Sequence, residues 1–159
     1  MKKIYLDYAA STPIDPRVFP IINKHLKNNF ANSMSLHFFG QKAAAAVEES
    51  RRKLAQIINA KPEEIIFTSS ATESNNLAIK GTAFAAKKRG KDHLVVSLIE
   101  HDCVLESARW LLSQGFKVSF LPVDSYGLIN LDELKNLIGK NTFLVSLMHA
   151  NNEIGTIED

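Results

Sequence analysis

The sequence predicts an α/β fold in which a mainly parallel sheet carries helices on both faces. Short apolar runs that suit buried strands alternate with segments of helical periodicity along most of the chain. Right-handed crossovers between parallel strands would place the intervening helices on both faces of the sheet. The composition agrees with a globular protein, because 45% of the 159 residues are hydrophobic and 23% are charged.

Two helices are expected before the first strand. One follows Asp15-Pro16, a typical helix start. Its apolar face consists of Val18, Ile21, Ile22, His25 and Leu26. The other helix is longer and ends near Asn59. Its apolar face consists of Phe39, Ala43, Val47, Ser50, Leu54, Ile57 and Ile58. Both patterns predict helices that bury one side and expose the other.

Four short apolar runs are the expected strands. They are residues 65–68, 94–97, 117–121 and 142–148. Pro122 closes the third run, because proline cannot continue a ladder of backbone hydrogen bonds. The last run is apolar over most of its length, which is typical of a strand that is buried on both faces.

Three further helices are expected between these strands. They span residues 73–88, 104–112 and 130–138. Gly90 and Gly115 would end the first two of them. Asn130 together with Glu133 is a capping pair that would start the third.

The chemistry is expected at one edge of this sheet. Ligands of parallel sheets bind beyond the carboxyl ends of the strands. Polar segments follow Thr68, Ser97 and Met148, which are the last residues of three expected strands. These segments are therefore the candidate site.

The first of them, residues 69–74, follows a strand and opens a helix. Backbone amides at a helix start are unpaired and carry partial positive charge, so this segment could bind a phosphate group. Ordinary capping by a serine or threonine explains the same pattern. The segment lacks the glycine-rich patterns of nucleotide-binding loops.

His101 and Cys103 follow the second strand. A neutral imidazole at His101 could stack on an aromatic ligand or move a proton, or it could be a loop histidine without a role. Cys103 begins an amphipathic helix and is predicted to be a small, partly buried residue rather than a nucleophile. As the single cysteine, it excludes an internal disulfide and suits a reducing compartment.

The third polar segment contains His149, Asn151, Asn152 and Glu153. The two asparagine side chains supply amide donors and acceptors that could orient a polar heterocycle, or they could simply form a turn. No second histidine stands at helical spacing from His149, so no metal site is predicted.

Five segments carry a resemblance to a known family. They are YLDYAASTPIDPRV, NSMSLHFFGQKA, EEIIFTSSATESNNLAIKG, EHDCVLES and VSLMHANNEIGTIED. From about Tyr5 to Asp159 they resemble, in order and spacing, the cysteine desulfurases. These are class V aminotransferases of fold type I, which use pyridoxal 5′-phosphate (PLP). The resemblance implies that residues 1–13 belong to the small domain of the family and that residues 14–159 form the first part of its large PLP-binding domain.

The resemblance also implies roles for particular residues. Ala71 and Thr72 would bind the cofactor phosphate. His101 would stack on the pyridine ring and act as the catalytic residue that shuttles protons. Asn152 would hydrogen-bond the 3′ oxygen of the cofactor, and Asn32 would lie near the substrate.

Two positions depart from the family pattern. Ser70 replaces a glycine, and it would cost about 1 kcal/mol if the backbone there needs a positive φ. Ser33 stands where the family usually has proline, so the loop from Asn32 to His37 is expected to be less rigid. Without the resemblance, this polar loop would be interpreted as a solvated connection.

The chain is shorter than members of the family, and the resemblance implies an amino-terminal part of such an enzyme. No lysine lies in the Ser-x-His-Lys context of the family's Schiff-base lysine. Cys103 does not align with the cysteine that accepts sulfur. The chain alone is expected to be inactive, because PLP chemistry needs that lysine and an acidic partner for the pyridine nitrogen.

The implied reaction converts L-cysteine to L-alanine and transfers sulfur to an enzyme cysteine, for iron–sulfur cluster or thio-cofactor assembly. The expected partners are L-cysteine, an iron–sulfur scaffold or another sulfur-acceptor protein, and a second copy in a homodimer. Two alternatives stay open. The chain could be a non-catalytic truncated remnant that binds a partner or desulfurase subunits, or it could belong to a selenocysteine lyase-type sibling.

Other classes of protein are excluded by charge and by the apolar runs. A net charge of +2 provides no basic patch for nucleic acid or a membrane surface. Asp7 interrupts the apolar residues near the start, so no signal peptide is predicted. The longest apolar run, residues 43–47, is far below the ~18 residues that span a bilayer. A soluble cytoplasmic protein is therefore expected.

Overall fold

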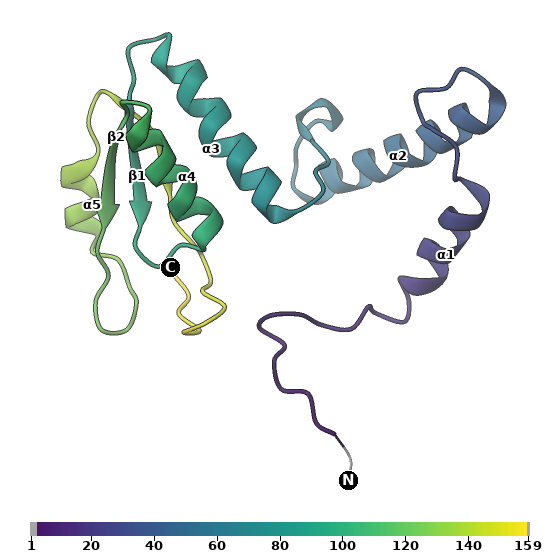
Figure 1. Cartoon of the computed structure of the whole chain (residues 1–159), viewed down its shortest axis with the longest axis horizontal. Coiled ribbons are helices and arrows are strands. Elements are labelled where there is room, and N and C mark those ends of the chain that lie inside the picture. Colours follow the sequence, from purple (N-terminus) through teal and green to yellow (C-terminus); the bar gives the residue numbers. More distant parts are fainter. Residues whose placement is uncertain (1–2, 159) are drawn as a thin grey trace. The chain divides into compact units, whose positions relative to one another are not determined.

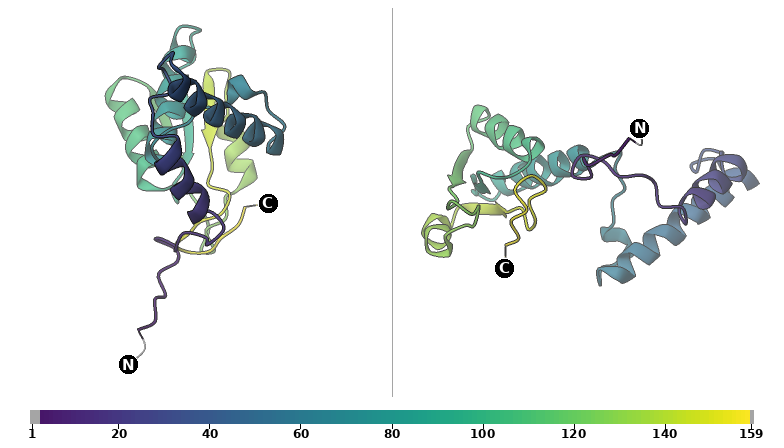
Figure 2. Two further views of the ribbon diagram at one scale, coloured as in Figure 1. Left: turned by 90° about the vertical axis from the view of Figure 1, so that its right-hand side faces the viewer. Right: turned by 90° about the horizontal axis from the view of Figure 1, so that it is seen from below.

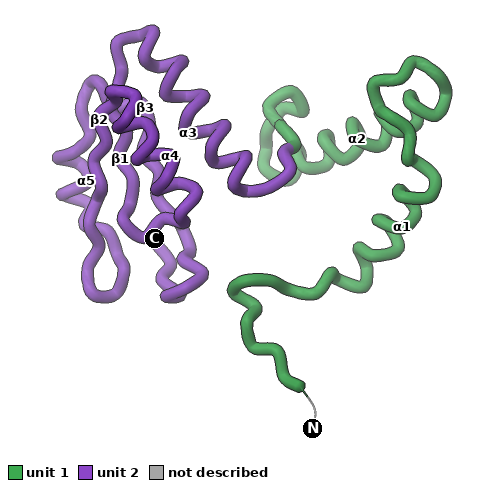
Figure 3. The backbone as a smooth tube through the Cα atoms, in the orientation of Figure 1, with its two compact units in different colours: residues 1–67 green, residues 68–159 purple. Residues whose placement is uncertain are grey.

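The structure is a computed structural model that describes residues 3–158. Met1, Lys2 and Asp159, which belong to the predicted segments 1–13 and 14–159, lie outside the described residues. The chain divides into two compact units, residues 1–67 and residues 68–159 (Figure 3). Each unit is described by itself below.

Unit 1 contains the two predicted amino-terminal helices, α1 (Phe19–Asn28) and α2 (Phe38–Ile57), followed by the short 3-10 turn η1 (Pro62–Glu64). Pro20 lies in the first turn of α1, where its missing N–H costs no helical hydrogen bond. The Nδ1 atom of His37 caps α2 by accepting from the Gly40 N–H at 3.3 Å. Both predicted helices are confirmed to within about two residues at their ends.

Residues 65–68 were predicted to form a strand, and this prediction is wrong for the described part of the chain. Ile65 has extended dihedral angles (φ −92°, ψ 121°), but no described residue pairs with the segment in a β ladder. The Ile65 carbonyl accepts instead from the Arg51 guanidinium, which also lies 5.0 Å from the centre of the Phe67 ring. An apolar run predicts an extended backbone, but only a neighbouring strand can turn that backbone into a sheet.

Unit 2 is an α/β unit built on a three-stranded parallel sheet with the strand order β2-β1-β3 (Figure 1). Its strands are β1 (His93–Ser97), β2 (Lys117–Leu121) and β3 (Thr142–Ser146). Its helices are α3 (Ala71–Lys87), α4 (Asp102–Ser113) and α5 (Leu131–Leu137). Three of the four predicted strands and all three predicted helices are confirmed, although β3 ends two residues before Met148.

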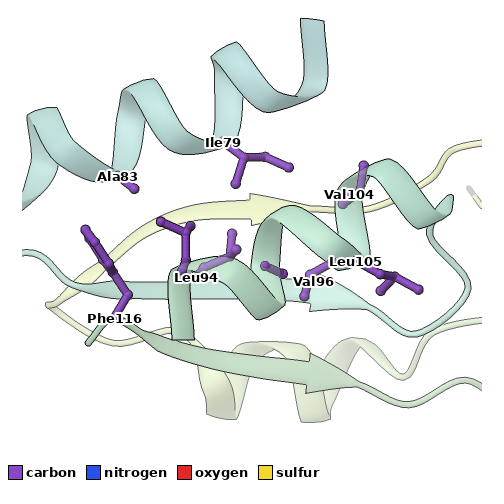
Figure 4. Close-up of a cluster of buried hydrophobic side chains, with 9 residues drawn as sticks. Ile79, Ala83, Leu94, Val96, Val104, Leu105 and Phe116 are labelled. Atoms are coloured by element: carbon purple, nitrogen blue, oxygen red, sulfur yellow. The ribbon is translucent and has the colours of Figure 1, made fainter. Parts of the chain in front are cut away.

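Helices cover both faces of this sheet, as predicted. Figure 2 shows α3 and α4 on one side of the strands and α5 on the other. The main core lies under α3 and α4 (Figure 4). Its members are Ile79, Ala83, Leu94, Val96, Val104, Leu105, Ala108, Leu111 and Phe116. Every residue of β1 is buried, because this strand lies between the other two.

The parallel strands place two connections of the candidate site at one edge of unit 2. Residues 98–101 follow β1 and lead into α4, and residues 147–158 follow β3. In Figure 1 both segments lie at the lower end of the sheet, near the start of α4. None of the helices within residues 3–158 combines the length and apolarity needed to cross a bilayer.

Candidate functional site

The start of α3 is organised by a serine cap. Ser70 has an extended backbone (φ −163°, ψ 165°), and its Oγ accepts from the Glu73 N–H at 3.2 Å. The Glu73 carboxylate accepts in turn from the Ser69 hydroxyl at 2.6 Å and from the Ser69 N–H at 2.7 Å. These hydrogen bonds, the one from the hydroxyl first, lower the pKa of Glu73. The strain expected at Ser70 is absent, because any residue adopts this extended conformation.

Ala71 and Thr72 are the first two residues of α3, and both are exposed. Within residues 3–158, their backbone N–H groups and the Thr72 hydroxyl donate no hydrogen bond. The capping role of the segment and its capacity for an anion therefore coexist, because the cap uses the Glu73 N–H and leaves two amides for a ligand.

His101 is the N-cap residue of α4. Its Nδ1 atom accepts from the Cys103 N–H at 3.1 Å, and its ring is exposed. Because Nδ1 must offer its lone pair to this bond, the proton of the neutral ring lies on Nε2. The cap therefore holds the imidazole at one nitrogen and leaves the other nitrogen and the ring face for a ligand.

The first turns of α3 and α4 lie against each other. The Asn75 Nδ2 atom donates to Cys103 Sγ at 3.1 Å, and the predicted partial burial of Cys103 is confirmed. Asn75 stands three residues after Thr72, so both lie on the same side of α3. The beginning of α3 is therefore tied to the beginning of α4, which His101 caps.

The loop after β3 completes the site. The Asn152 side chain is exposed and makes no hydrogen bond within residues 3–158. Asn152 and His101 line one pocket of about 110 Å³. Its other lining residues are Ile99, Glu100, Asp102, Met148, Asn151 and Glu153. The structure therefore brings together two predicted side chains from separate segments of the sequence.

Glu100 forms a buried acidic wall of this pocket. It is 9% exposed, and burial raises the pKa of its carboxyl above the ordinary value of 4.5. Hydrogen bonds from the Ser146 hydroxyl, at 3.5 Å, and from the Met148 N–H oppose this rise in the pKa only in part. The carboxyl is therefore harder to ionise in the folded protein than in the unfolded chain.

Glu100→Gln is expected to increase the free energy of unfolding at neutral pH. The raised pKa means that the folded protein binds the proton of Glu100 more tightly than the unfolded chain does. The stability that Glu100 contributes is thus fully present below its ordinary pKa and is lost as the pH rises through the raised value. Glutamine keeps an acceptor oxygen without the charge. Urea denaturation of the complete protein over a pH series measures the effect.

The exposed Glu63 provides the control for this experiment, since Glu63→Gln replaces a solvated carboxylate. Its pH profile of stability is expected to follow the wild type. Identical profiles for Glu100→Gln and wild type would contradict the physical account of Glu100.

Asn32, predicted to lie near the substrate, belongs to unit 1. Its Oδ1 accepts from the Met34 N–H at 2.9 Å, which closes a turn in the loop before α2. Ser33 of the same loop lines a groove of unit 1 together with Ile21 and Phe67. Among the described residues, no three His, Cys, Asp or Glu side chains are placed to share a metal ion.

Three contributions to the site were missed by sequence reasoning. Asn75 joins two helix starts, Glu100 is a buried acid, and Asn151 anchors the loop that carries Asn152. Each depends on a partner far away in the sequence, so periodicity and spacing carry no signal for it. The pair of asparagines predicts amide groups for a ligand or a turn, without distinguishing the two positions.

Comparison with known proteins decides the family. The aminotransferase class-V family matches residues 4–159. The chain belongs to this family. The members of this family include the cysteine desulfurases, so the predicted resemblance is confirmed. Class V aminotransferases and cysteine desulfurases use PLP.

Relatives that are similar to this class V chain over nearly its whole length are named cysteine desulfurases. "Cysteine desulfurase IscS" of Dictyoglomus turgidum is 50% identical over 157 residues, which are 99% of this chain and 40% of that protein. "Cysteine desulfurase, mitochondrial" of Candida albicans is 49% identical over 158 residues, 99% of this chain and 32% of that protein. The chain thus spans two fifths or less of the length of these relatives.

Solved structures confirm the predicted fold of this class V member. A NifS-like protein superimposes with a TM-score of 0.93 at 41% identity, over 99% of this chain and 43% of that one. The protein SspA, solved in complex with cysteine, gives a TM-score of 0.89 at 43% identity, over 97% and 44% of the two chains. The sheet and its helices correspond to a part of these larger proteins.

Proposed function

We propose that the protein containing this chain is a PLP-dependent cysteine desulfurase and that the chain supplies one side of its cofactor site. The observation that carries the proposal is the meeting of His101 and Asn152 in one pocket. The two unpaired amides at the start of α3, in the same unit, support it. The names of the relatives support the same activity.

The groups present fit the three parts of PLP. The amides of Ala71 and Thr72, with the Thr72 hydroxyl, would bind the phosphate as donors at a helix start. The exposed ring of His101 would stack on the pyridine ring, and the unbonded amide of Asn152 would donate to the 3′ oxygen. When bound, PLP supplies an electron sink for the bonds broken at the substrate.

In this proposal His101 is the catalytic residue. Its Nδ1 is fixed by the Cys103 N–H, so the group that can donate a proton to the substrate is Nε2–H. The cap keeps the imidazole in one tautomer and one orientation, and the ring would use its face for the cofactor and its edge for the proton.

The proposed reaction uses L-cysteine and yields L-alanine, and the sulfur passes to an enzyme cysteine. An iron–sulfur scaffold or another sulfur-acceptor protein would take the sulfur onward, and the intact enzyme would be a homodimer. The Schiff-base lysine and the acceptor cysteine would come from outside these 159 residues, so the chain alone is expected to be inactive. Residues 1–13 would belong to the small domain and residues 14–159 to the large one.

A reducing compartment is part of the proposal. Cys103 is a free thiol, which suits the cytoplasm. The Candida albicans relative is named as mitochondrial.

The proposal is tested by measuring L-alanine formation from L-cysteine and PLP binding by the complete protein. Thr72→Val is expected to raise the Kd for PLP by about tenfold, because a hydrogen bond to a charged phosphate is lost. Thr82→Val is the matched control on the same helix, since the Thr82 hydroxyl donates to the Ala78 carbonyl at 2.5 Å. Thr82→Val is expected to bind PLP as tightly as wild type.

The same assay distinguishes the alternatives. A folded complete protein that binds no PLP would overturn the proposal and favour a non-catalytic protein that binds desulfurase subunits. Turnover of L-selenocysteine without turnover of L-cysteine would indicate the selenocysteine lyase-type sibling instead.

A further inference from the structure

Asn151 is the best-anchored polar side chain at the edge of the sheet. Its Oδ1 accepts from the N–H groups of Glu153 at 2.8 Å and of Ile154 at 3.0 Å. Its Nδ2 donates to the Ile99 carbonyl at 2.9 Å, across 52 positions of sequence. The first two bonds form a local turn, whereas the third joins two separate segments of the pocket.

Asn130 provides the comparison that isolates the third bond. Its Oδ1 also accepts from two N–H groups, of Asp132 at 2.9 Å and of Glu133 at 3.2 Å. It caps α5 with these local bonds, and within residues 3–158 its Nδ2 reaches no distant acceptor. The two asparagines therefore share a local role and differ in the link to Ile99.

The hydrogen bond from Asn151 to Ile99 joins the segments that carry the two predicted cofactor residues, Asn152 and His101. Ile99 is two positions before His101, and Asn151 is bonded directly to Asn152 in the chain. All four residues line the same pocket. The side-chain amide of Asn151 therefore joins the segment of Asn152 to the segment of His101, beside the hydrogen bonds that Glu100 accepts from Ser146 and Met148.

The outer end of the same loop is held elsewhere. The Thr156 hydroxyl donates to the Tyr126 carbonyl at 2.5 Å, and the Ile129 N–H donates to Glu158 Oε1 at 3.1 Å. Both bonds fix the loop to residues 124–129, away from the pocket. Backbone hydrogen bonds join the two ends of the loop, from the Asn151 N–H to the Thr156 carbonyl and from the Glu158 N–H to the His149 carbonyl, both at 2.8 Å. The Asn151 side chain adds the hydrogen bond to Ile99, beside His101.

We propose that Asn151 is a positioning residue that holds Asn152 and His101 at the separation needed to contact one ligand together. The proposal rests on the proposed function, since the ligand is PLP. Asn151 would touch neither the cofactor nor the substrate. It would act through Asn152, whose hydrogen bond to the 3′ oxygen of PLP depends on the position of the loop.

The test compares Asn151→Asp with Asn130→Asp in the complete protein. Aspartate keeps the oxygens that accept from the turn amides and removes the N–H that donates to Ile99. In the protein without PLP, Asn151→Asp is expected to increase amide hydrogen exchange in residues 99–103, whereas Asn130→Asp is not. This measurement needs no cofactor and tests the link directly.

The second measurement follows bound PLP. Asn151→Asp is expected to raise the Kd for PLP by about tenfold and to shift the pH midpoint of its visible absorbance, since the 3′ oxygen loses its donor. Asn130→Asp is expected to change neither. If Asn151 had only a structural role, Asn151→Asp would lower the free energy of unfolding without shifting the pH midpoint of the PLP absorbance. If Asn151→Asp fails to fold, Asn151→Ser replaces it, because a serine hydroxyl is too short to reach Ile99.

Every outcome decides between the two proposals. Exchange, Kd and absorbance midpoint equal to those of Asn130→Asp would overturn the positioning role. Increased exchange with unchanged PLP binding would overturn it as well. A wild-type protein that binds no PLP would overturn the proposed function and, with it, the positioning for PLP, while the exchange measurement would still report whether Asn151 joins the two segments.

Discussion

Leu111→Ala is expected to destabilise the protein by about 2–5 kcal/mol. Leu111 lies on α4, is 0% exposed and packs in the cluster with Leu94 and Phe116. Alanine removes the buried methyl groups and leaves a cavity, because α4 and the sheet cannot close around it without moving their backbones. Urea denaturation of the complete protein measures the change in the free energy of unfolding.

The next residue provides a matched control. Leu112 has the same side chain and the same helix, but it is 44% exposed, because one step along a helix turns a side chain by about 100°. Leu112→Ala is expected to change the free energy of unfolding by about 0.5 kcal/mol or less. Equal losses for the two variants would contradict the core described for unit 2.

His101→Asn is expected to lower kcat/KM for L-cysteine by about 10²–10⁴-fold in the complete protein. Asparagine removes the imidazole that would stack on PLP and move the proton. It keeps an oxygen that can accept from the Cys103 N–H, so the start of α4 stays capped. The loss is therefore expected in catalysis and in the absorbance of bound PLP, with little change in stability.

His101→Phe separates the cap from the ring. Phenylalanine keeps an aromatic face but cannot accept from the Cys103 N–H, so it is expected to lose about 1 kcal/mol of stability. It is also expected to be as inactive as His101→Asn, since neither variant can transfer a proton. Wild-type activity in His101→Asn would exclude His101 as the proton-transfer group.

The regular elements could be predicted from sequence because their causes are local. Apolar spacing along α4 predicted its buried side, and Asn130 with Glu133 predicted the start of α5, where Asn130 does cap the helix. The parallel pairing of β1 with its neighbours followed from the alternation of strands and helices. The failure at residues 65–68 has the opposite cause, since a strand depends on a partner that local sequence does not specify.

The residues of the candidate site could be predicted because they stand at the ends of strands and at the starts of helices. Thr72, His101 and Asn152 each follow an apolar run, so their common edge of the sheet could be expected. The distances between these residues could not be predicted, because they depend on tertiary contacts such as the hydrogen bond from Asn75 to Cys103. Whether Ser70 strains the backbone also could not be predicted from the sequence, since the strain depends on the φ angle. The structure shows that Ser70 has an extended backbone.

By itself, the sequence determined the α/β class, nearly every helix and strand, the family and the candidate residues, because each follows from short-range patterns along one chain. The tertiary structure alone decided that Asn151 joins the two sides of the pocket and that Glu100 is buried beside His101. Hydrogen bonds across 52 positions and the dielectric surroundings of a carboxyl arise only when distant segments pack together, so neither is encoded in local spacing.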